Sequence, residues 1–176
     1  MSIKQDLLDK VQGFQNAAKN HEVDKLMDMF AEDAKFHIDG QNPLIGKEEI
    51  RSIFEYDAGV NGELVFINCT SEGDTVSCQV LERNDRLKAS GINELLYPSC
   101  AFTFRDGLII EFKAVRDAER AQAQAKMWPK FRQWVSEKYP NDYLKLFDVE
   151  GKFIRNFENG KRSVQLLKEW RANQDL

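Results

Sequence analysis

Five polar side chains fall where they could act on a small molecule. Glu82 ends the alternating stretch TVSCQVLE, and Asp39 ends the stretch AKFHID. A carboxylate among apolar groups gains proton affinity, so either residue could be a general base. Tyr97, Ser99 and Arg116 lie on later strand-like segments and could bind or polarise a substrate. The chemistry that this set suggests is proton transfer in a cavity.

Arg116 on such an inner face would need a carboxylate partner, because an unpaired buried charge is costly. Glu82 or Asp39 could be that partner. Two interpretations stay open. The pair could be structural, at the mouth of a cavity, or the arginine could orient a carboxylate that activates water.

Metal and cofactor chemistry have little support in the sequence. His37 faces away from Phe36 and Ile38 in the alternating pattern, so it is interpreted as an exposed or interface residue. The histidines lack HExxH or HxH spacing, and the 3 cysteines lack CxxC spacing. GxGxxG, the phosphate-binding glycine motif and a lysine Schiff-base context are also absent. We predict no metal and no cofactor.

The first third of the chain alternates between helix and strand signals. Apolar residues recur at helical spacing over residues 3–19, and again in a shorter stretch over residues 23–30. Phe36 and Ile38 then share one face of a strand. Acidic residues after Gly46 begin a third helix, which ends near Gly59.

Two hairpins follow. The first turns at Gly73 and Asp74, pairs Glu72 with Thr75, and carries an apolar face that ends at Glu82. The second turns at Asp106 and Gly107. Its predicted pairs are Ala101 with Phe112, Ser99 with Ala114, and Tyr97 with Arg116, all on one inner face.

The opposite face of the second hairpin is apolar and would need cover. We interpret it as a homodimer surface or as the docking site of the chain after Asp117; its residues are Cys100, Phe102, Phe104, Ile109 and Val115. Residues 84–93 show no periodicity and are interpreted as a loop or a kinked strand. The tail should form a helix kinked or restarted at Pro129, then short helices over 141–148 and 161–173.

Composition limits the class of protein. The net charge is −4, with an acidic body and a mildly basic tail, which argues against a nucleic-acid partner. No charged and apolar leader and no apolar run of membrane-spanning length is present, so we expect no membrane partner and a cytoplasmic location.

The stretches HEVDKLMDMFAEDAKFHIDGQNPLIGKEEIRSIF and FTFRDGLIIEFKAVRD resemble the nuclear transport factor 2-like, or SnoaL-like, superfamily over residues 1–117. The resemblance implies an α+β, cystatin-like cone in which a curved antiparallel sheet wraps around N-terminal helices. It also implies an apolar pocket, and often a homodimer. Residues 118–176 would then be a helical extension that packs on the domain or on a dimer partner.

The resemblance also ranks the site residues. The base of proton-shuttling members falls at Ile38, so Asp39 would serve only if the strand slipped by one residue. The second carboxyl of ketosteroid isomerases falls near Ser99, a weaker acid, which argues against that activity. The predicted catalytic residues are Glu82 and Asp39, and the predicted substrate-binding residues are Tyr97, Ser99, Arg116, Phe112, Ile38 and Phe36.

We therefore predict a protein that binds a small, largely apolar molecule and, if it is an enzyme, a cofactor-independent isomerase, lyase or hydrolase. The alternative is a non-catalytic interaction module. Its aromatic tail would then recognise a protein partner. In either case the tail could close the open end of the cone as a lid or embrace a second subunit.

Overall fold

The computed structural model describes residues 3–174, apart from the side chains of residues 3, 120 and 124. The first elements are α1 (Ile3–Lys19), α2 (Val23–Asp28), β1 (Phe30–Ile38), β2 (Leu44–Ile45) and α3 (Lys47–Gly59). The hairpin β3 (Glu63–Glu72) and β4 (Thr75–Arg83) leads through α4 (Asp85–Ala89) into the hairpin β5 (Leu95–Arg105) and β6 (Leu108–Val115). The chain ends with α5 (Ala118–Lys138), α6 (Pro140–Leu146) and α7 (Phe157–Ala172).

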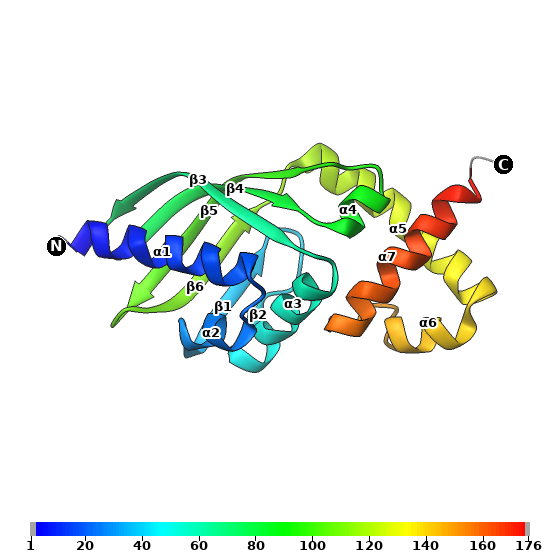
Figure 1. Ribbon diagram of the computed structural model, residues 1–176, viewed down its shortest axis with the longest axis horizontal. Helices are drawn as coiled ribbons and strands as arrows, with labels where there is room; N and C mark the ends of the chain where they lie inside the picture. Colours follow the sequence, from blue (N-terminus) through cyan, green and yellow to red (C-terminus); the bar gives the residue numbers. More distant parts are fainter. Residues whose placement is uncertain (1–2, 175–176) are drawn as a thin grey trace.

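The strands form one six-stranded sheet in the order β2-β1-β6-β5-β4-β3. Neighbours are antiparallel except β1 and β6, which run parallel. The sheet is strongly curved, and the C-terminal helices gather at the end of the molecule away from the N-terminus (Figure 1). The predicted α+β class, with a curved sheet, N-terminal helices and a helical C-terminal segment, is confirmed.

Aromatic side chains join the helices to the concave face of the sheet. The ring of Phe14 on α1 packs edge-on against Phe30, Phe54, Phe66 and Phe102, with centroids 5.2 to 6.0 Å apart. These rings come from two helices and three strands. Because a buried aromatic ring contributes a few kcal/mol of stabilisation, about 1.5–3 each, this group holds α1 and α3 against the sheet.

One-residue irregularities decide which side chains face inward. The β5–β6 hairpin starts as predicted, with Arg105 opposite Leu108, but its register shifts between Thr103 and Phe104. Ser99 consequently pairs with Val115 and is exposed. The prediction that Ser99 lies on the inner face is wrong, because a slip of one residue turns every later side chain over.

The same shift overturns the predicted apolar outer face. Cys100 and Phe102 lie opposite Ala114 and Phe112 on the inner face, and both are buried in the core. Phe104 and Ile109 are buried with them. Homodimerisation stays a prediction, now without the surface from which it was argued.

Tyr97 still faces inward, because a second irregularity lies between Cys78 and Val80 in the β4–β5 pairing. Val80 pairs with Tyr97 and both are buried, whereas Cys78 pairs with Cys100. In β3 a third shift falls between Ile67 and Thr70. The curved sheet therefore contains bulges, and these bring side chains of both odd- and even-numbered residues of a strand into the interior.

Helix α4 was missed by the periodicity analysis, which interpreted residues 84–93 as a loop or a kinked strand. Asn84 begins it: the Oδ1 atom of its buried side chain accepts a hydrogen bond from the backbone N–H of Leu87 at 2.7 Å. Gly91 follows the helix with a φ of 81°. An asparagine N-cap and a glycine after the last turn are the usual boundaries of a helix, and this one is simply short.

The C-terminal segment has its own apolar cluster, and its aromatic rings pack on one another. The buried members are Phe131, Val135, Leu146, Phe147, Leu166, Leu167 and Trp170. Helix α5 runs through Pro129 without interruption, so the predicted restart there is wrong. Across residues 3–174, no helix combines the length and apolar character that crossing a membrane requires.

Two glycines allow α3 and α7 to touch. A Cβ atom added at Gly59 would lie 2.1 Å from the carbonyl oxygen of Phe157, and one at Gly160 would lie 2.8 Å from that of Tyr56. Both obstacles are backbone atoms, which cannot swing away as a side chain could. This contact therefore holds the C-terminal helices close to the sheet domain.

Replacing Gly59 with alanine should therefore reduce the free energy of unfolding by about 1–3 kcal/mol, as overpacking commonly does. Gly13 on α1 is the matched control, since its added Cβ meets only the methyl of Met29, at 3.7 Å. Gly13→Ala should be neutral or stabilising by about 0.5–1 kcal/mol. Urea unfolding curves measure both. Equal effects of the two changes would contradict the close helix contact.

Candidate functional site

A cavity of about 150 Å³ lies between the sheet, α3, α4 and the start of the C-terminal segment. Its apolar wall includes Phe36, Phe54, Leu64, Val80, Leu95 and Phe112. The rings of Phe36 and Phe112 stack with centroids 4.6 Å apart, because β1 and β6 place these residues side by side. The wall is therefore rigid and suited to an apolar group.

Six of the eight site residues predicted from the sequence line this cavity: Phe36, Ile38, Glu82, Tyr97, Phe112 and Arg116. Ser99 and Asp39 do not. Asp39 is exposed beyond the end of β1, so the structure gives no support to its predicted role as a base.

Arg116 follows β6 at the cavity mouth, and its Nε atom donates to the backbone carbonyl of Asp39 at 2.9 Å. Gly40 makes room for it, since a Cβ at that residue would lie 2.6 Å from a guanidinium nitrogen. Within residues 3–174, Arg116 forms no ion pair with Glu82 or Asp39. The predicted pair is wrong, because Arg116 is only half-buried and a neutral carbonyl suffices.

Glu82 is held by two hydrogen bonds inside the cavity. The hydroxyl of Tyr97 donates to Oε2 at 2.6 Å, and the side-chain N–H of Asn84 donates to Oε1 at 2.6 Å. Burial raises the pKa of Glu82, while these two donors and the nearby Arg86 charge oppose the rise. Burial and the neighbouring Glu82 carboxylate together raise the pKa of Tyr97 well above its usual value.

A second carboxyl group, that of Asp57 on α3, also lines the cavity. Burial, and then repulsion from Glu82, raises the pKa of Asp57 to about 8, and Arg155 opposes this rise. Among the described residues, no side chain donates a hydrogen bond that would favour its ionised form. Sequence analysis missed Asp57, although it follows Ile53 and Phe54 by four and three residues and so shares their inward face.

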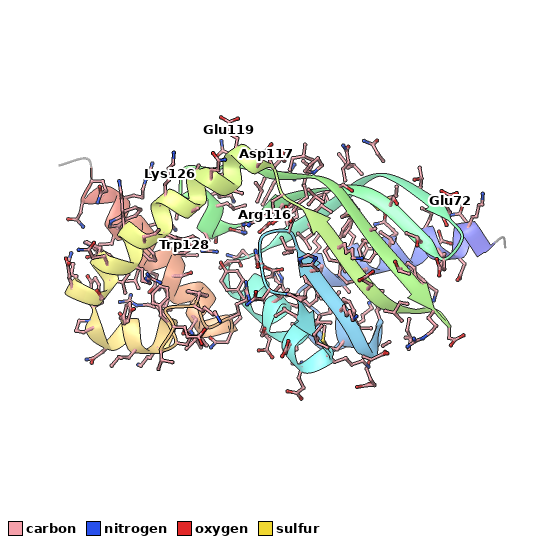
Figure 2. All side chains as sticks on the ribbon, turned by 180° about the vertical axis from the view of Figure 1, so that it is seen from behind. Glu72, Arg116, Asp117, Glu119, Lys126 and Trp128 are labelled. Atoms are coloured by element: carbon pink, nitrogen blue, oxygen red, sulfur yellow. The ribbon has the colours of Figure 1, made fainter. Side chains whose placement is uncertain are left out.

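The mouth of the cavity carries three arginines from separate parts of the chain. Besides Arg116, Arg86 of α4 donates from Nη1 to the Tyr56 hydroxyl at 2.8 Å and lies 3.8 Å from the ring centroid of Trp128. Arg155 donates from Nη2 to Oε1 of Gln41 at 2.8 Å. Figure 2 shows Arg116 and Trp128 at the junction between the sheet and the C-terminal helices.

Beyond these arginines the cavity meets a wider hollow of about 740 Å³. Arg86, Arg116, Arg155, Gln41 and Trp128 line both spaces, so they form the boundary between them. The outer wall comes largely from the C-terminal segment. That segment therefore supplies part of the entrance to the cavity.

Asn84 links the local fold to the site, because one side chain caps α4 and also donates to Glu82. Asn84→Ala should lower the free energy of unfolding by about 1–3 kcal/mol, through the lost cap and an unpaired carboxylate oxygen. Asn84→Ser keeps a cap acceptor and should lose less. Urea unfolding separates the two variants; if they were equally stable, the capping contribution would be absent.

Comparison with known proteins agrees with the fold. Residues 11–112 match the family model described as a SnoaL-like domain. An epoxide hydrolase of the LEH-like type from M. tuberculosis superposes with a TM-score of 0.56 at 16% identity, over 67% of this chain and 87% of that one. The epoxide hydrolase/cyclase-like enzyme SalBIII, described for pyran ring formation in the polyether salinomycin, gives a TM-score of 0.55 at 15% identity, over 62% and 88%.

A de novo designed protein with a curved β-sheet fits equally well, with a TM-score of 0.55 at 14% identity, over 73% of this chain and 98% of that one. Similarity at this level shows the fold alone. Among curated proteins, none matches the chain. The family match covers more than half of the sequence, and the curved sheet and N-terminal helices agree with it; the chain belongs to the SnoaL-like domain family.

Proposed function

We propose that the protein binds a small molecule in the cavity and acts on it by acid–base chemistry without a cofactor. The observation that carries this proposal is a pair of unequal carboxyl groups, Glu82 and Asp57, in one apolar-walled cavity. Glu82 accepts two hydrogen bonds, whereas the side chain of Asp57 accepts none from the residues that the structure describes. Environments that give two neighbouring carboxyl groups different pKa values are typical of a catalytic acid and a catalytic base.

In this proposal Glu82 is the base and Asp57 is the acid. Donors favour the ionised form of a carboxyl, so Glu82 releases its proton first. Asp57, with a pKa of about 8, keeps its proton at neutral pH. Glu82 then takes a proton from a substrate C–H group or from water, while Asp57 gives its proton to the substrate oxygen on which negative charge develops.

Tyr97 and Asn84 position the base, since each donates to one oxygen of Glu82. A carboxylate oxygen has two lone pairs, so each can still accept a proton. The reaction classes that need only these parts are isomerisation or elimination next to a carbonyl, and addition of water to an epoxide. In isomerisation Glu82 returns its proton to a different carbon of the substrate, and Asp57 recovers its own proton from the enol. In elimination and in epoxide opening the proton on Glu82 passes to solvent and Asp57 takes one from solvent. Both groups are thus regenerated, and no oxidant or reductant is needed.

Native mass spectrometry of the purified protein tests the binding step. We expect a small molecule to co-purify with the wild type and to be lost from Leu64→Trp, which fills the cavity from its apolar wall. Leu108→Trp is the matched control, because Leu108 is 38% exposed at the tip of the β5–β6 hairpin. Equal retention by both variants would place the ligand elsewhere and contradict the proposal.

The alternative, an interaction module with an aromatic tail, gains no support from the packing. The aromatic rings of the tail are largely engaged with one another. Met127 and Trp128 of α5 line the cavity instead. We propose that residues 1–117 form the catalytic domain and that residues 118–176 are an extension that closes the open end of its cone.

A further inference from the structure

The hollow outside the cavity gathers positive charge in a chain whose net charge is −4. Five cationic side chains line it: Arg86, Arg116, Arg132, Lys152 and Arg155. Asp148 is the acidic residue of that wall, and its Oδ1 atom already accepts the backbone N–H groups of residues 150 and 152. Lys152 forms an ion pair with Glu150, so the local excess of positive charge comes from the four arginines.

The arginines of the hollow are positioned by neutral acceptors. Arg132 donates to the carbonyl of Gly151 at 2.9 Å, Arg116 to a backbone carbonyl, Arg155 to an amide oxygen and Arg86 to a hydroxyl. In the described part of the chain, none of these four forms an ion pair with a carboxylate. A guanidinium has five N–H donors, so each retains donors for a further acceptor.

Three of these side chains are held near one another at the boundary between hollow and cavity. Burial, and to a smaller extent the nearby Arg86 charge, lowers the pKa of Arg155, while Tyr56 and Asp57 oppose the change. Stacking on Trp128 fixes the plane of Arg86. Rigid and mutually repelling guanidinium groups favour an anion between them, because planar N–H pairs match the oxygens of a carboxylate or phosphate.

We propose that the ligand is amphipathic: a carboxylate or phosphate group binds Arg86, Arg116 and Arg155 at the boundary, and an apolar body enters the cavity. The inference rests on the proposed function for the body of the ligand, and adds its charged end. Glu82 inside the cavity repels an anion, so the ligand enters body first. Its reactive carbon or oxygen then lies near the two carboxyl groups.

Isothermal titration calorimetry on the full chain tests this with octanoate, octyl phosphate, neutral octanol and inorganic phosphate. We expect at least one of the octyl anions to bind about tenfold or more tightly than octanol, and more weakly as salt rises. The better of the two identifies the head group as carboxylate or phosphate. Inorganic phosphate should bind more weakly than octyl phosphate.

Variants locate the anion. Arg155→Gln and Arg116→Gln should each weaken the better anion about tenfold and leave octanol unchanged. Arg105→Gln is the control, because Arg105 is exposed at the end of β5 and pairs with Asp33 at 3.0 Å. These glutamine variants keep a polar side chain, and their folding is checked by urea unfolding.

Two results would overturn the inference while leaving the cavity ligand intact. One is octanol binding as tightly as both anions, and the other is unchanged anion binding in Arg155→Gln and Arg116→Gln. Inorganic phosphate binding as tightly as octyl phosphate would also reject the amphipathic ligand in favour of a free anion. If Leu64→Trp leaves binding of every probe unchanged, the proposed function itself fails.

Discussion

Asp57→Asn should make the protein more stable than the wild type at pH 8 to 9, and nearly equal to it at pH 4. The pKa of Asp57 rises from 3.8 to about 8 in the folded chain. Between those values the folded protein keeps a proton that the unfolded chain has lost. Stability therefore falls as pH rises through this window, and asparagine, which does not titrate, escapes the loss.

The size of this effect follows from the shift in pKa. Each unit corresponds to about 1.4 kcal/mol, so the full shift sets a ceiling of about 6 kcal/mol, and partial hydration of the cavity lowers it to about 2–5. Urea unfolding from pH 4 to pH 9 measures the difference. Asp28→Asn, at the exposed end of α2, is the control and should follow the wild type. Parallel pH curves for Asp57→Asn and wild type would remove Asp57 as the acid.

The fold was predictable because its signals are local. Helical spacing located α1 and α3, and the dipeptides Gly73-Asp74 and Asp106-Gly107 fixed both hairpin turns. Such local patterns do not show where a bulge interrupts a strand. The pairing of Ser99 depends on one extra residue in β6, opposite the Thr103–Phe104 step of β5. Nothing in the composition of either strand indicates where this bulge falls.

The candidate site was predictable only where a local pattern marks its residues. Glu82 and Arg116 lie at strand ends, where the pattern placed them at the cavity. Asp57 could have been found, since α3 carries its apolar face up to that residue. Arg155 could not, because it lies between α6 and α7 and reaches the mouth only when α7 docks on α3. A side chain brought in by long-range packing leaves no periodic signal.

Glu82→Gln should reduce proton abstraction by about 10²–10⁴-fold, the range that a positioned general base supplies. Two probes separate the reaction classes without knowledge of the natural substrate. Hydrogen–deuterium exchange next to the carbonyl of an enolisable octyl ketone acid reports removal of a C–H proton. Incorporation of ¹⁸O from labelled water into an octyl epoxide acid reports hydrolysis.

Glutamine preserves the size of Glu82 and can still accept a hydrogen bond from Tyr97, so the change removes the base with little loss of packing. Glu72→Gln is the matched control: Glu72 is exposed at the end of β3, far from Arg116 in Figure 2. Its rates should equal those of the wild type. If Glu82→Gln kept the wild-type rate in whichever probe reacts, Glu82 would not be the base. If neither probe reacts with the wild type while octyl anions still bind, the cavity is a binding site and the chemistry proposed for its two acids is wrong.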